Sequence, residues 1–219
     1  EALSLANTLS QVTEAWPDAE LIVSDGASAD ATVKIAEAKG ARVIRNEVAG
    51  RGPQLRAGAA QASRDWLLFL HADTLVTPAA ARVADDFCLR PNALVATFQL
   101  EFDQADWFLR LSVWWTRFDS VFTRFGDQGI LIRRSYYDEL GGFQPWPLFE
   151  DVDLLRRARR RQSVSVLDAT VTTSARRFRA RGAVRQQVSN AWLLLRFLVG
   201  GDPFKLAGHY PSADQLKRR

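Results

Sequence analysis

Acidic side chains stand at the edge of apolar segments at three places: Asp25, Asp73 and the pair Glu150-Asp151. The apolar run WLLFL (66–70) stops abruptly at His71-Ala72-Asp73. A carboxylate at such a strand end either caps the turn that follows or binds a hard cation. Mg²⁺ takes one or two carboxylates and fills its other positions with substrate phosphates and water. A lone Asp73 therefore suffices for a metal site if a diphosphate supplies other oxygens.

The other two acidic positions allow different chemistry. Asp25 ends the apolar segment ELIVS (20–24) and precedes Gly26, so it either forms the turn DGASAD or accepts hydrogen bonds from a base or ribose. Glu150 and Asp151 open a helix, where the dipole favours acids. Neighbouring helical side chains diverge by about 100°, so the two cannot flank one glycosidic bond, but one could act as a single general base.

Composition excludes several other classes of site. One cysteine (Cys88) rules out an internal disulfide framework, and only two histidines argue against structural zinc. P-loop spacing, a G-x-G-x-x-G after the first strand and a nucleophilic triad are all absent. No apolar stretch reaches the roughly 18–20 residues that cross a bilayer. The arginine-rich segment 156–185 indicates a solvated helix face, a phosphate-rich ligand or an anionic membrane surface, with no nucleic-acid-binding module visible.

The first half of the chain alternates between strand and helix patterns. Apolar runs predict strands over 20–24, 41–46 and 65–70, and amphipathic segments predict helices over 30–40, 53–62 and 78–88. This alternation is typical of an α/β fold with a mostly parallel sheet flanked by helices. Ligands bind at the carboxyl ends of such strands, which places Asp25 and Asp73 at the rim of a site.

The second half is less regular. We expect a strand over 92–102, an aromatic-rich helix over 105–122, a turn and strand over 126–134, a helix over 149–161, one or two strands within 163–175, and a last helix over 182–201. The last helix, with Trp192 and six further large apolar residues, carries too many for one narrow stripe. It packs on the domain, forms a dimer contact, or inserts shallowly at a membrane interface.

Taken together, these segments resemble the family 2 glycosyltransferases, which have the glycosyltransferase-A fold. The resemblance lies in IVSDGASADATVKIA, in NEVAGRGPQLRAGAAQASRDWLLFLHADTLVTP and in GDQGILIRRSYYDELGGFQPWPLFEDVDLLRRARR. The chain is most similar to the small bacterial transferases associated with radical-SAM or selenium-domain proteins, which share His-Ala-Asp and TTSARR. The resemblance implies a Rossmann-like mixed, mostly parallel sheet, with a catalytic domain over 1–181 and a C-terminal helical extension over 182–219.

The resemblance also implies roles for the acidic residues. Asp25 would contact the base of the nucleotide, Asp73 would hold the metal that bridges the donor diphosphate, and Asp151 would be the general base. His71 stands where the family has the first acid of Asp-x-Asp. It either binds metal as neutral imidazole or orients the loop, and the preference of Mg²⁺ for oxygen favours orientation.

Four further residues are assigned to binding of the nucleotide sugar on the same ground: Arg51, Glu150, Arg176 and Arg177. The two last arginines lie where longer family members have Q-x-x-R-W. The family also begins with a central strand, and the resemblance aligns only its final residue with this sequence, as Glu1. Without that strand a sheet would expose two unpaired edges, so we expect the natural protein to contain it.

These expectations combine into one hypothesis. The chain is a metal-dependent glycosyltransferase that uses Mg²⁺ or Mn²⁺ and a nucleotide-diphosphate sugar, inverts the anomeric centre and acts in the cytoplasm, at the inner face of the membrane or as a homodimer if the last helix makes such contacts. Its acceptor is unidentified, and nucleic acid is not an expected partner. Two alternatives stay open: a nucleotidyltransferase of similar fold, and a non-catalytic nucleotide-sugar-binding or membrane-associated protein.

Overall fold

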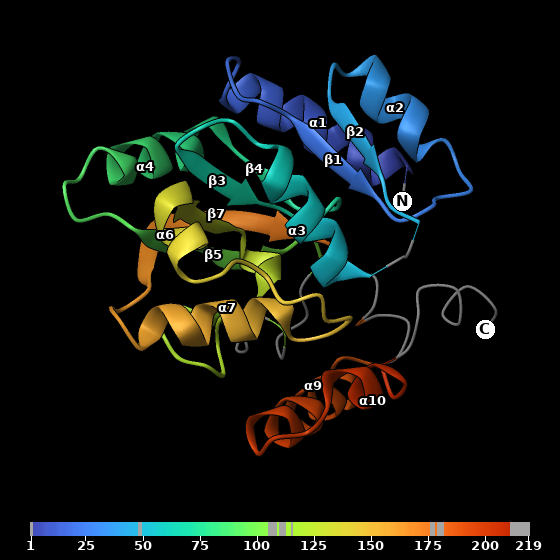
Figure 1. Cartoon of the computed structure of the whole chain (residues 1–219), viewed down its shortest axis with the longest axis vertical. Helices are drawn as coiled ribbons and strands as arrows, with labels where there is room; N and C mark the ends of the chain where they lie inside the picture. The colour runs from blue at the N-terminus through green and yellow to red at the C-terminus, as the bar shows by residue number, and fades with distance from the viewer. Residues whose placement is uncertain are drawn as a thin grey trace.

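The computed structural model describes residues 2–47, 50–104, 109, 113–114, 116–175, 178 and 182–210, with helices arranged around a twisted sheet (Figure 1). The helices are α1 (Ala2–Ala15), α2 (Thr32–Ala38), α3 (Arg51–Gln61), α4 (Pro78–Cys88), α6 (Arg134–Glu139), α7 (Glu150–Arg159), α9 (Ala183–Leu198), α10 (Pro203–Ala207) and the 3₁₀ turn η1 (Gly126–Gln128). The strands are β1 (Ile22–Asp25), β2 (Arg42–Arg45), β3 (Trp66–Phe69), β4 (Leu75–Val76), β5 (Val95–Phe102), β6 (Ile130–Arg133) and β7 (Ser165–Thr173). No helix within these ranges is long and apolar enough to cross a membrane.

The described strands form two sheets. One consists of β1 and β2, and the other has the order β3-β6-β5-β7-β4. The pairs β1–β2 and β5–β7 are parallel, whereas β3–β6, β5–β6 and β4–β7 are antiparallel. The mixed α/β fold expected from the sequence is confirmed, with a smaller parallel share than the strand–helix alternation indicated. The reason is the second half of the chain, which lacks the regular crossover helices that parallel pairing requires.

Helix α1 shows how the first half is packed. Leu5, Leu9 and Val12 recur at helical spacing and are buried, so one face of α1 is apolar. Leu5 and Leu9 join Ala36 of α2 and Ala41 in a small core, with β1 and β2 side chains packed on it. No helix was expected over residues 2–15, although the helical spacing of the apolar residues Leu5, Leu9 and Val12 is visible in the sequence.

A cavity of about 1270 Å³ separates the two sheets and continues to the carboxyl end of β3. Residues 22–24 of β1 and 66–69 of β3 line it together with α1 and α3. Strands β1 and β3, each of which pairs with only one described strand, therefore border the same cavity. The expectation that the natural protein contains a further, central strand stays a prediction, as does the domain boundary at residue 181.

The aromatic helix expected over 105–122 is partly wrong. Residues 105–108, 110–112 and 115 lie outside the described part of the chain, and residues 116–122 form turns and bends. Within them, Thr116 donates its hydroxyl to Val113 O (2.7 Å) and Thr123 donates to Phe118 O (2.6 Å). Such local side-chain bonds to backbone carbonyls compete with a helix.

Candidate active site

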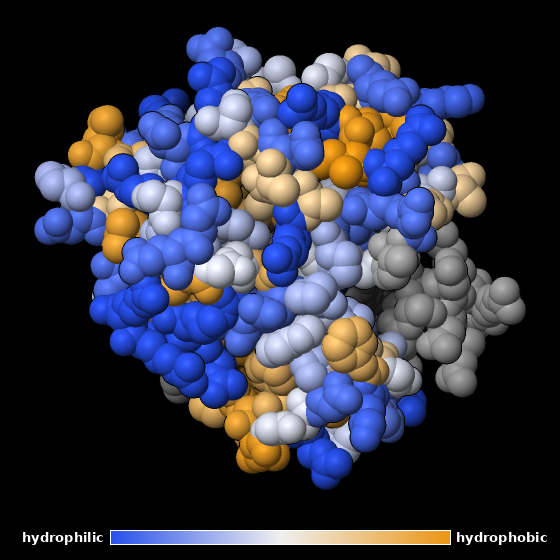
Figure 2. Space-filling model, in the orientation of Figure 1, coloured by the Kyte–Doolittle hydropathy of each residue, from blue (hydrophilic) through white to orange (hydrophobic). Residues whose placement is uncertain are grey.

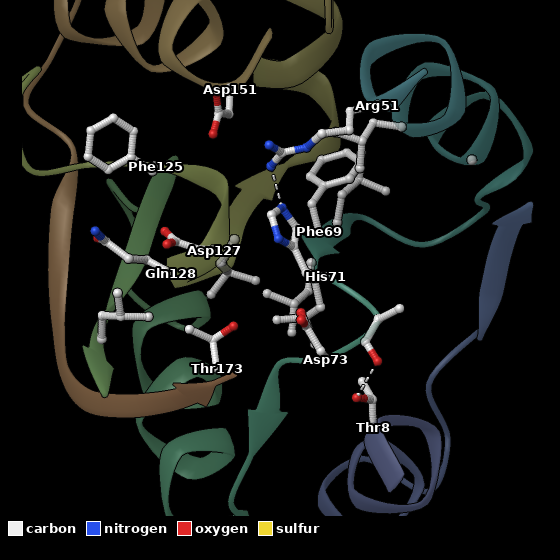
Figure 3. A pocket seen from close by; sticks show the side chains of 18 of the residues that line it. Thr8, Arg51, Phe69, His71, Asp73, Phe125, Asp127, Gln128, Asp151 and Thr173 are labelled. Atoms are coloured by element: carbon white, nitrogen blue, oxygen red, sulfur yellow. Dashed lines mark hydrogen bonds between the residues drawn. The ribbon is translucent and has the colours of Figure 1, made fainter. Parts of the chain in front are cut away.

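The carboxyl end of β3 gives way to a tight turn that carries His71 and Asp73. The N–H of Thr74 donates to the carbonyl of His71 at 3.0 Å. The hydroxyl of Thr8 in α1 donates to the carbonyl of Ala72 at 3.0 Å and holds the turn from the other side. Both His71 and Asp73 line the cavity, as Figure 3 shows. The sequence-based placement of these residues outside the core is therefore confirmed.

The antiparallel register of β3 and β6 brings a second segment to the same place. Phe69, the last residue of β3, pairs with Ile130, the first residue of β6. Residues that follow β3 and residues that precede β6 must therefore lie side by side. The turn η1 comes directly before β6, and it places Asp127 in the cavity near Asp73 (Figure 3).

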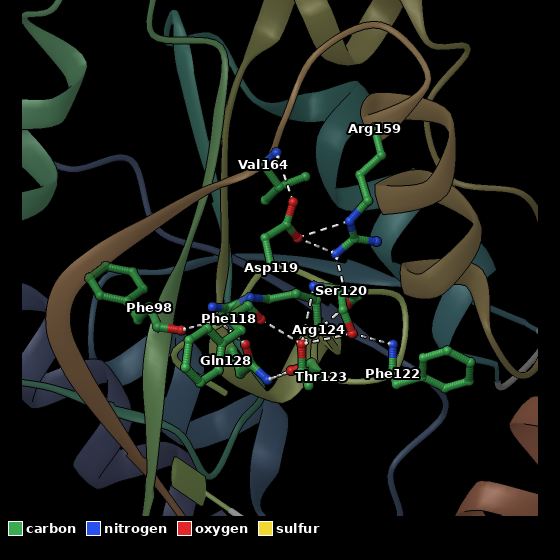
Figure 4. A network of polar contacts seen from close by, with 10 residues as sticks. All are labelled: Phe98, Phe118, Asp119, Ser120, Phe122, Thr123, Arg124, Gln128, Arg159 and Val164. Atoms are coloured by element: carbon green, nitrogen blue, oxygen red, sulfur yellow. Dashed lines mark hydrogen bonds and ion pairs between the residues drawn. The ribbon is translucent and has the colours of Figure 1, made fainter. Parts of the chain in front are cut away.

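Buried polar side chains hold η1 against the central strand β5. Gln128 is fully buried; its amide nitrogen donates to Thr123 O at 2.5 Å and its oxygen accepts from Arg124 Nη1 at 2.6 Å. Arg124, also fully buried, donates from the same nitrogen to Phe98 O in β5 at 3.1 Å (Figure 4). Burial lowers the pKa of Arg124 to about 10. This network ties the turn to the central sheet and so limits how far Asp127 can move.

Asp151 reaches the cavity from the first turn of α7. Its Oδ2 accepts the N–H of Gly126 at 2.5 Å, and its Oδ1 accepts the N–H of Val152 at 2.7 Å. A Cβ at position 126 would lie 3.0 Å from Asp151 Oδ2 and 3.3 Å from His71 Nε2. Glycine at this position therefore lets the carboxylate and the imidazole approach one backbone segment.

Arg51, the first residue of α3, links the histidine to the acidic pair. Its Nη2 donates to His71 Nε2 at 2.6 Å, and its Nε lies 3.2 Å from Glu150 Oε1. The start of α3 is fixed because Gly52 N–H donates to Trp146 O at 3.1 Å, where an added Cβ would lie 2.5 Å from that oxygen. Burial opposes the charged form of Arg51, but Glu150 and further acids outweigh it and raise its pKa.

The acidic groups perturb one another. Burial, followed by the charge of Asp151, raises the pKa of Asp127 to about 6; Arg51 opposes this and Asp73 adds to it. Burial raises the pKa of Glu150 to about 7, with Arg51 opposing and Asp151 adding. The site therefore concentrates negative charge around one guanidinium.

A divalent cation fits this charge distribution. Asp127 lines the cavity, and its Oδ1 is a buried acceptor without a hydrogen-bond partner among the described residues. No group of three or more His, Cys, Asp or Glu side chains in the described ranges forms a full metal cage. A cation that shares its coordination with diphosphate oxygens and water needs only one or two carboxylates, such as Asp73 and Asp127.

The structure does not bring all of the sequence-predicted site residues together. Asp73, His71, Arg51 and Asp151 line one cavity, whereas Glu150 is fully buried behind Arg51 and does not line it. Asp25 lies apart from this group.

Asp25 is 5% exposed, and its Oδ2 accepts the N–H of Ser28 at 3.0 Å, so it closes the turn after β1. It is not among the cavity-lining residues. Arg176 and Arg177 lie outside the described residues, so their assignment stays a prediction.

Sequence reasoning missed Asp127 and its supporting residues. The segment GDQG was interpreted only as a turn before a strand, since glycine and aspartate are common in turns. The sequence does show an acid, Asp127, just before the apolar strand β6. Its importance becomes visible only when the antiparallel register of β6 and β3 is known, because that register brings Asp127 next to His71 and Asp73.

A family model described as Glycosyl transferase family 2 matches residues 1–143. No curated protein matches the chain.

Several solved structures have a similar fold. The mannosyltransferase PcManGT from Pyrobaculum calidifontis, in complex with GDP-Man and Mn2+, has a TM-score of 0.67 and 16% identity, covering 99% of this chain and 65% of that chain. TarS 1-349 of S. aureus in complex with UDP has a TM-score of 0.63 and 14% identity, covering 90% and 62%. Glucosyl-3-phosphoglycerate synthase from Mycobacterium tuberculosis, in complex with phosphoglyceric acid, has a TM-score of 0.64 and 17% identity, covering 92% and 77%. The chain spans less than two thirds of the first two proteins, and at these identities the likeness shows the fold.

Proposed function

The chain belongs to glycosyl transferase family 2, whose members are transferases, and from that premise we propose that this enzyme moves a sugar from a nucleotide-diphosphate sugar to an acceptor hydroxyl, with inversion. The observation that carries the proposal is the position of Asp151. Two backbone N–H groups orient its carboxylate, and it faces a cavity shared with Asp73, Asp127 and Arg51.

Asp151 is the proposed general base. Each carboxylate oxygen has two lone pairs, so the bonds from Gly126 and Val152 leave each oxygen able to accept one further donor, such as the acceptor hydroxyl. The acceptor oxygen forms a bond to the anomeric carbon while the bond from that carbon to the diphosphate oxygen breaks. The bonding electron pair leaves with the diphosphate, and the acceptor proton goes to Asp151.

Asp73 and Asp127 are the proposed ligands of Mg²⁺ or Mn²⁺. The cation would offset charge on the leaving diphosphate when bound. In support, the similar mannosyltransferase was solved with GDP-Man and Mn2+. We assign His71 to orienting this loop, because its Nε2 already accepts a hydrogen bond from Arg51.

The remaining assignments concern the donor. Arg51 is a fixed cation beside the acidic cluster and would contact diphosphate oxygens, with Glu150 holding it in place. Asp25 would contact the base at the end of β1, and Arg176 and Arg177 would contact phosphate or acceptor. A thermal-shift screen of UDP-, GDP-, dTDP- and CDP-sugars, with and without Mn²⁺, identifies the donor. A ligand at a hundredfold excess over Kd stabilises by about 2.7 kcal/mol.

The test of the base is Asp151→Asn. We expect donor binding to persist while turnover falls by about 10²–10⁴, because the acceptor proton loses its destination. Asp153→Asn, on the same helix but outside the cavity lining, is the matched control and should retain turnover. Near-normal turnover by Asp151→Asn would remove this assignment. Product analysis also separates sugar transfer from pyrophosphate release, the mark of a nucleotidyltransferase.

A further inference from the structure

Helix α9 carries a second apolar face that stays largely exposed in the described part of the chain, although its Trp192 meets the His209 ring edge-on with centroids 6.0 Å apart. Its members, here named the outer stripe, are exposed by between 47% and 82%: Val184, Val188, Trp192, Leu195 and Val199. Their spacing of four, four, three and four residues confines them to an arc of about 80°. Such regularity indicates one continuous surface and not scattered apolar residues.

The outer stripe does not hold α9 on the domain. That role belongs to the opposite face, where Leu193, Leu194 and Phe197 are buried. Phe197 stacks on Phe149 with ring centroids 4.8 Å apart, and Val152 of α7 belongs to the same cluster. One face of α9 therefore holds the helix on the domain, and most of the second face stays exposed and can contact a partner.

Basic side chains predominate around the outer stripe, although the N-cap of α10, Asp202, is acidic. Helix α9 contains Arg185 and Arg196 and no acidic residue, and α10 contains Lys205. Arg196 lies over the Trp192 ring, 5.5 Å from its centroid. Phe204 of α10 is also exposed, by 60%. In Figure 2, apolar side chains surface among polar ones at the lower end, where Figure 1 places α9 and α10.

We propose that the outer stripe docks the protein onto a bilayer surface that contains anionic phospholipids. Exposed apolar side chains, a tryptophan and flanking arginines together match an interfacial helix that lies in the headgroup region. The basic side chains add electrostatic attraction to anionic lipid. A symmetric contact between two copies through this stripe would instead bring arginines of like charge together without acidic counterparts on α9.

The docking face lies close to the candidate active site. Gln187, Asn190 and Leu194 of α9 line the cavity that contains Asp73 and Asp151. The outer stripe borders this cavity, because Leu195 of the stripe also lines it. If the proposed function holds, an acceptor presented at the bilayer surface lies within reach of the site; the docking itself does not depend on that function.

The test is co-sedimentation of the whole chain with vesicles, in the absence of donor and acceptor. Phosphatidylcholine vesicles with phosphatidylglycerol should bind the protein at low salt, and vesicles of phosphatidylcholine alone should bind it more weakly. Binding should weaken at 1 M salt, where the Debye length falls to about 3 Å. Val188→Gln and Leu195→Gln should each reduce the partition coefficient on the order of tenfold.

Leu89→Gln is the matched control, because Leu89 is 83% exposed at the end of α4, away from the outer stripe. It should bind vesicles as the unaltered chain does, and all three variants should unfold at unchanged temperature. The proposal fails if no binding occurs at low salt or if Leu89→Gln and the stripe variants lose binding equally. It also fails if light scattering shows a dimer that Leu195→Gln disrupts while vesicle binding is absent, since the stripe would then be an interface between copies.

Discussion

Glu150→Gln should make the protein more stable above neutral pH and change the pH dependence of unfolding. The side chain of Glu150 is fully buried, and its pKa is raised from 4.5 to about 7, chiefly by burial. A folded-state pKa above the unfolded one means that the folded chain holds the proton more tightly. The resulting stability is fully present below pH 4.5 and is lost as pH rises through 7.

The magnitude follows from the two pKa values. The gap between 4.5 and about 7 corresponds to about 3 kcal/mol, at about 1.4 kcal/mol for each pKa unit. Glutamine has nearly the shape of protonated glutamate and cannot ionise. The variant and the unaltered chain should therefore have similar free energies of unfolding near pH 4.5, and the variant should lead by about 3 kcal/mol near pH 8. For a chain of this size that difference is about 6–12 °C in Tm.

Urea unfolding of both proteins without metal or nucleotide, at several pH values between 4.5 and 8, measures this difference. Glu139→Gln is the control, since Glu139 is 62% exposed and pairs with Arg161 at the surface. An exposed pair is worth about 1 kcal/mol or less, so the control should show no comparable rise with pH. A difference for Glu150→Gln that stays constant with pH, or that shrinks toward pH 8, would refute the reasoning about its buried charge.

Two further predictions concern the turn η1. Asp127→Asn should weaken nucleotide-sugar binding in the presence of Mn²⁺ and leave metal-free binding unchanged. Nucleotide-sugar binding to the unaltered chain with Mn²⁺ should also weaken below about pH 6, where Asp127 takes up a proton. Calorimetry measures both effects, with the variant Asp168→Asn at an exposed position as the control. Gly126→Ala should lower turnover by at least about tenfold, because its Cβ would press on Asp151 and His71 and displace the base by tenths of an ångström. Gly58→Ala is its control: there the Cβ would meet Ser24 only at 3.8 Å, so this variant should gain up to about 1 kcal/mol of stability and keep its turnover.

The sequence alone predicted the two segments that carry the site, His71–Asp73 and Glu150-Asp151, but not that they lie close together in the fold. The apolar run before His71 and Asp73 predicts a buried strand that ends at a rim, because five apolar or aromatic residues cannot continue into an imidazole and a carboxylate without leaving the core. The Glu150-Asp151 pair likewise predicts a helix start. These inferences depend on local pattern, and the structure confirms the positions of both segments.

What local pattern could not supply is the register. Asp127 approaches Asp73 because Phe69 pairs with Ile130. This pairing is set by contacts among β3, β6 and β5, which are far apart in the sequence. The buried Arg124 was equally hidden, since arginine rarely occupies a core and nothing around it in the sequence marks it as an exception.

Burying several acids in this site costs folding free energy, which explains why other groups are placed to stabilise them. Three buried or half-buried acids close together oppose folding through desolvation and mutual repulsion, as the raised pKa values of Asp127 and Glu150 show. Arg51 and two backbone N–H groups offset part of that cost, and the Gln128–Arg124 network keeps the turn from relaxing away. Because unfavourable charge in the free protein is relieved when a cation arrives, the same strain that lowers stability should raise affinity for a metal-bound diphosphate. A site of this kind is expected to depart from the rules that govern the rest of the fold.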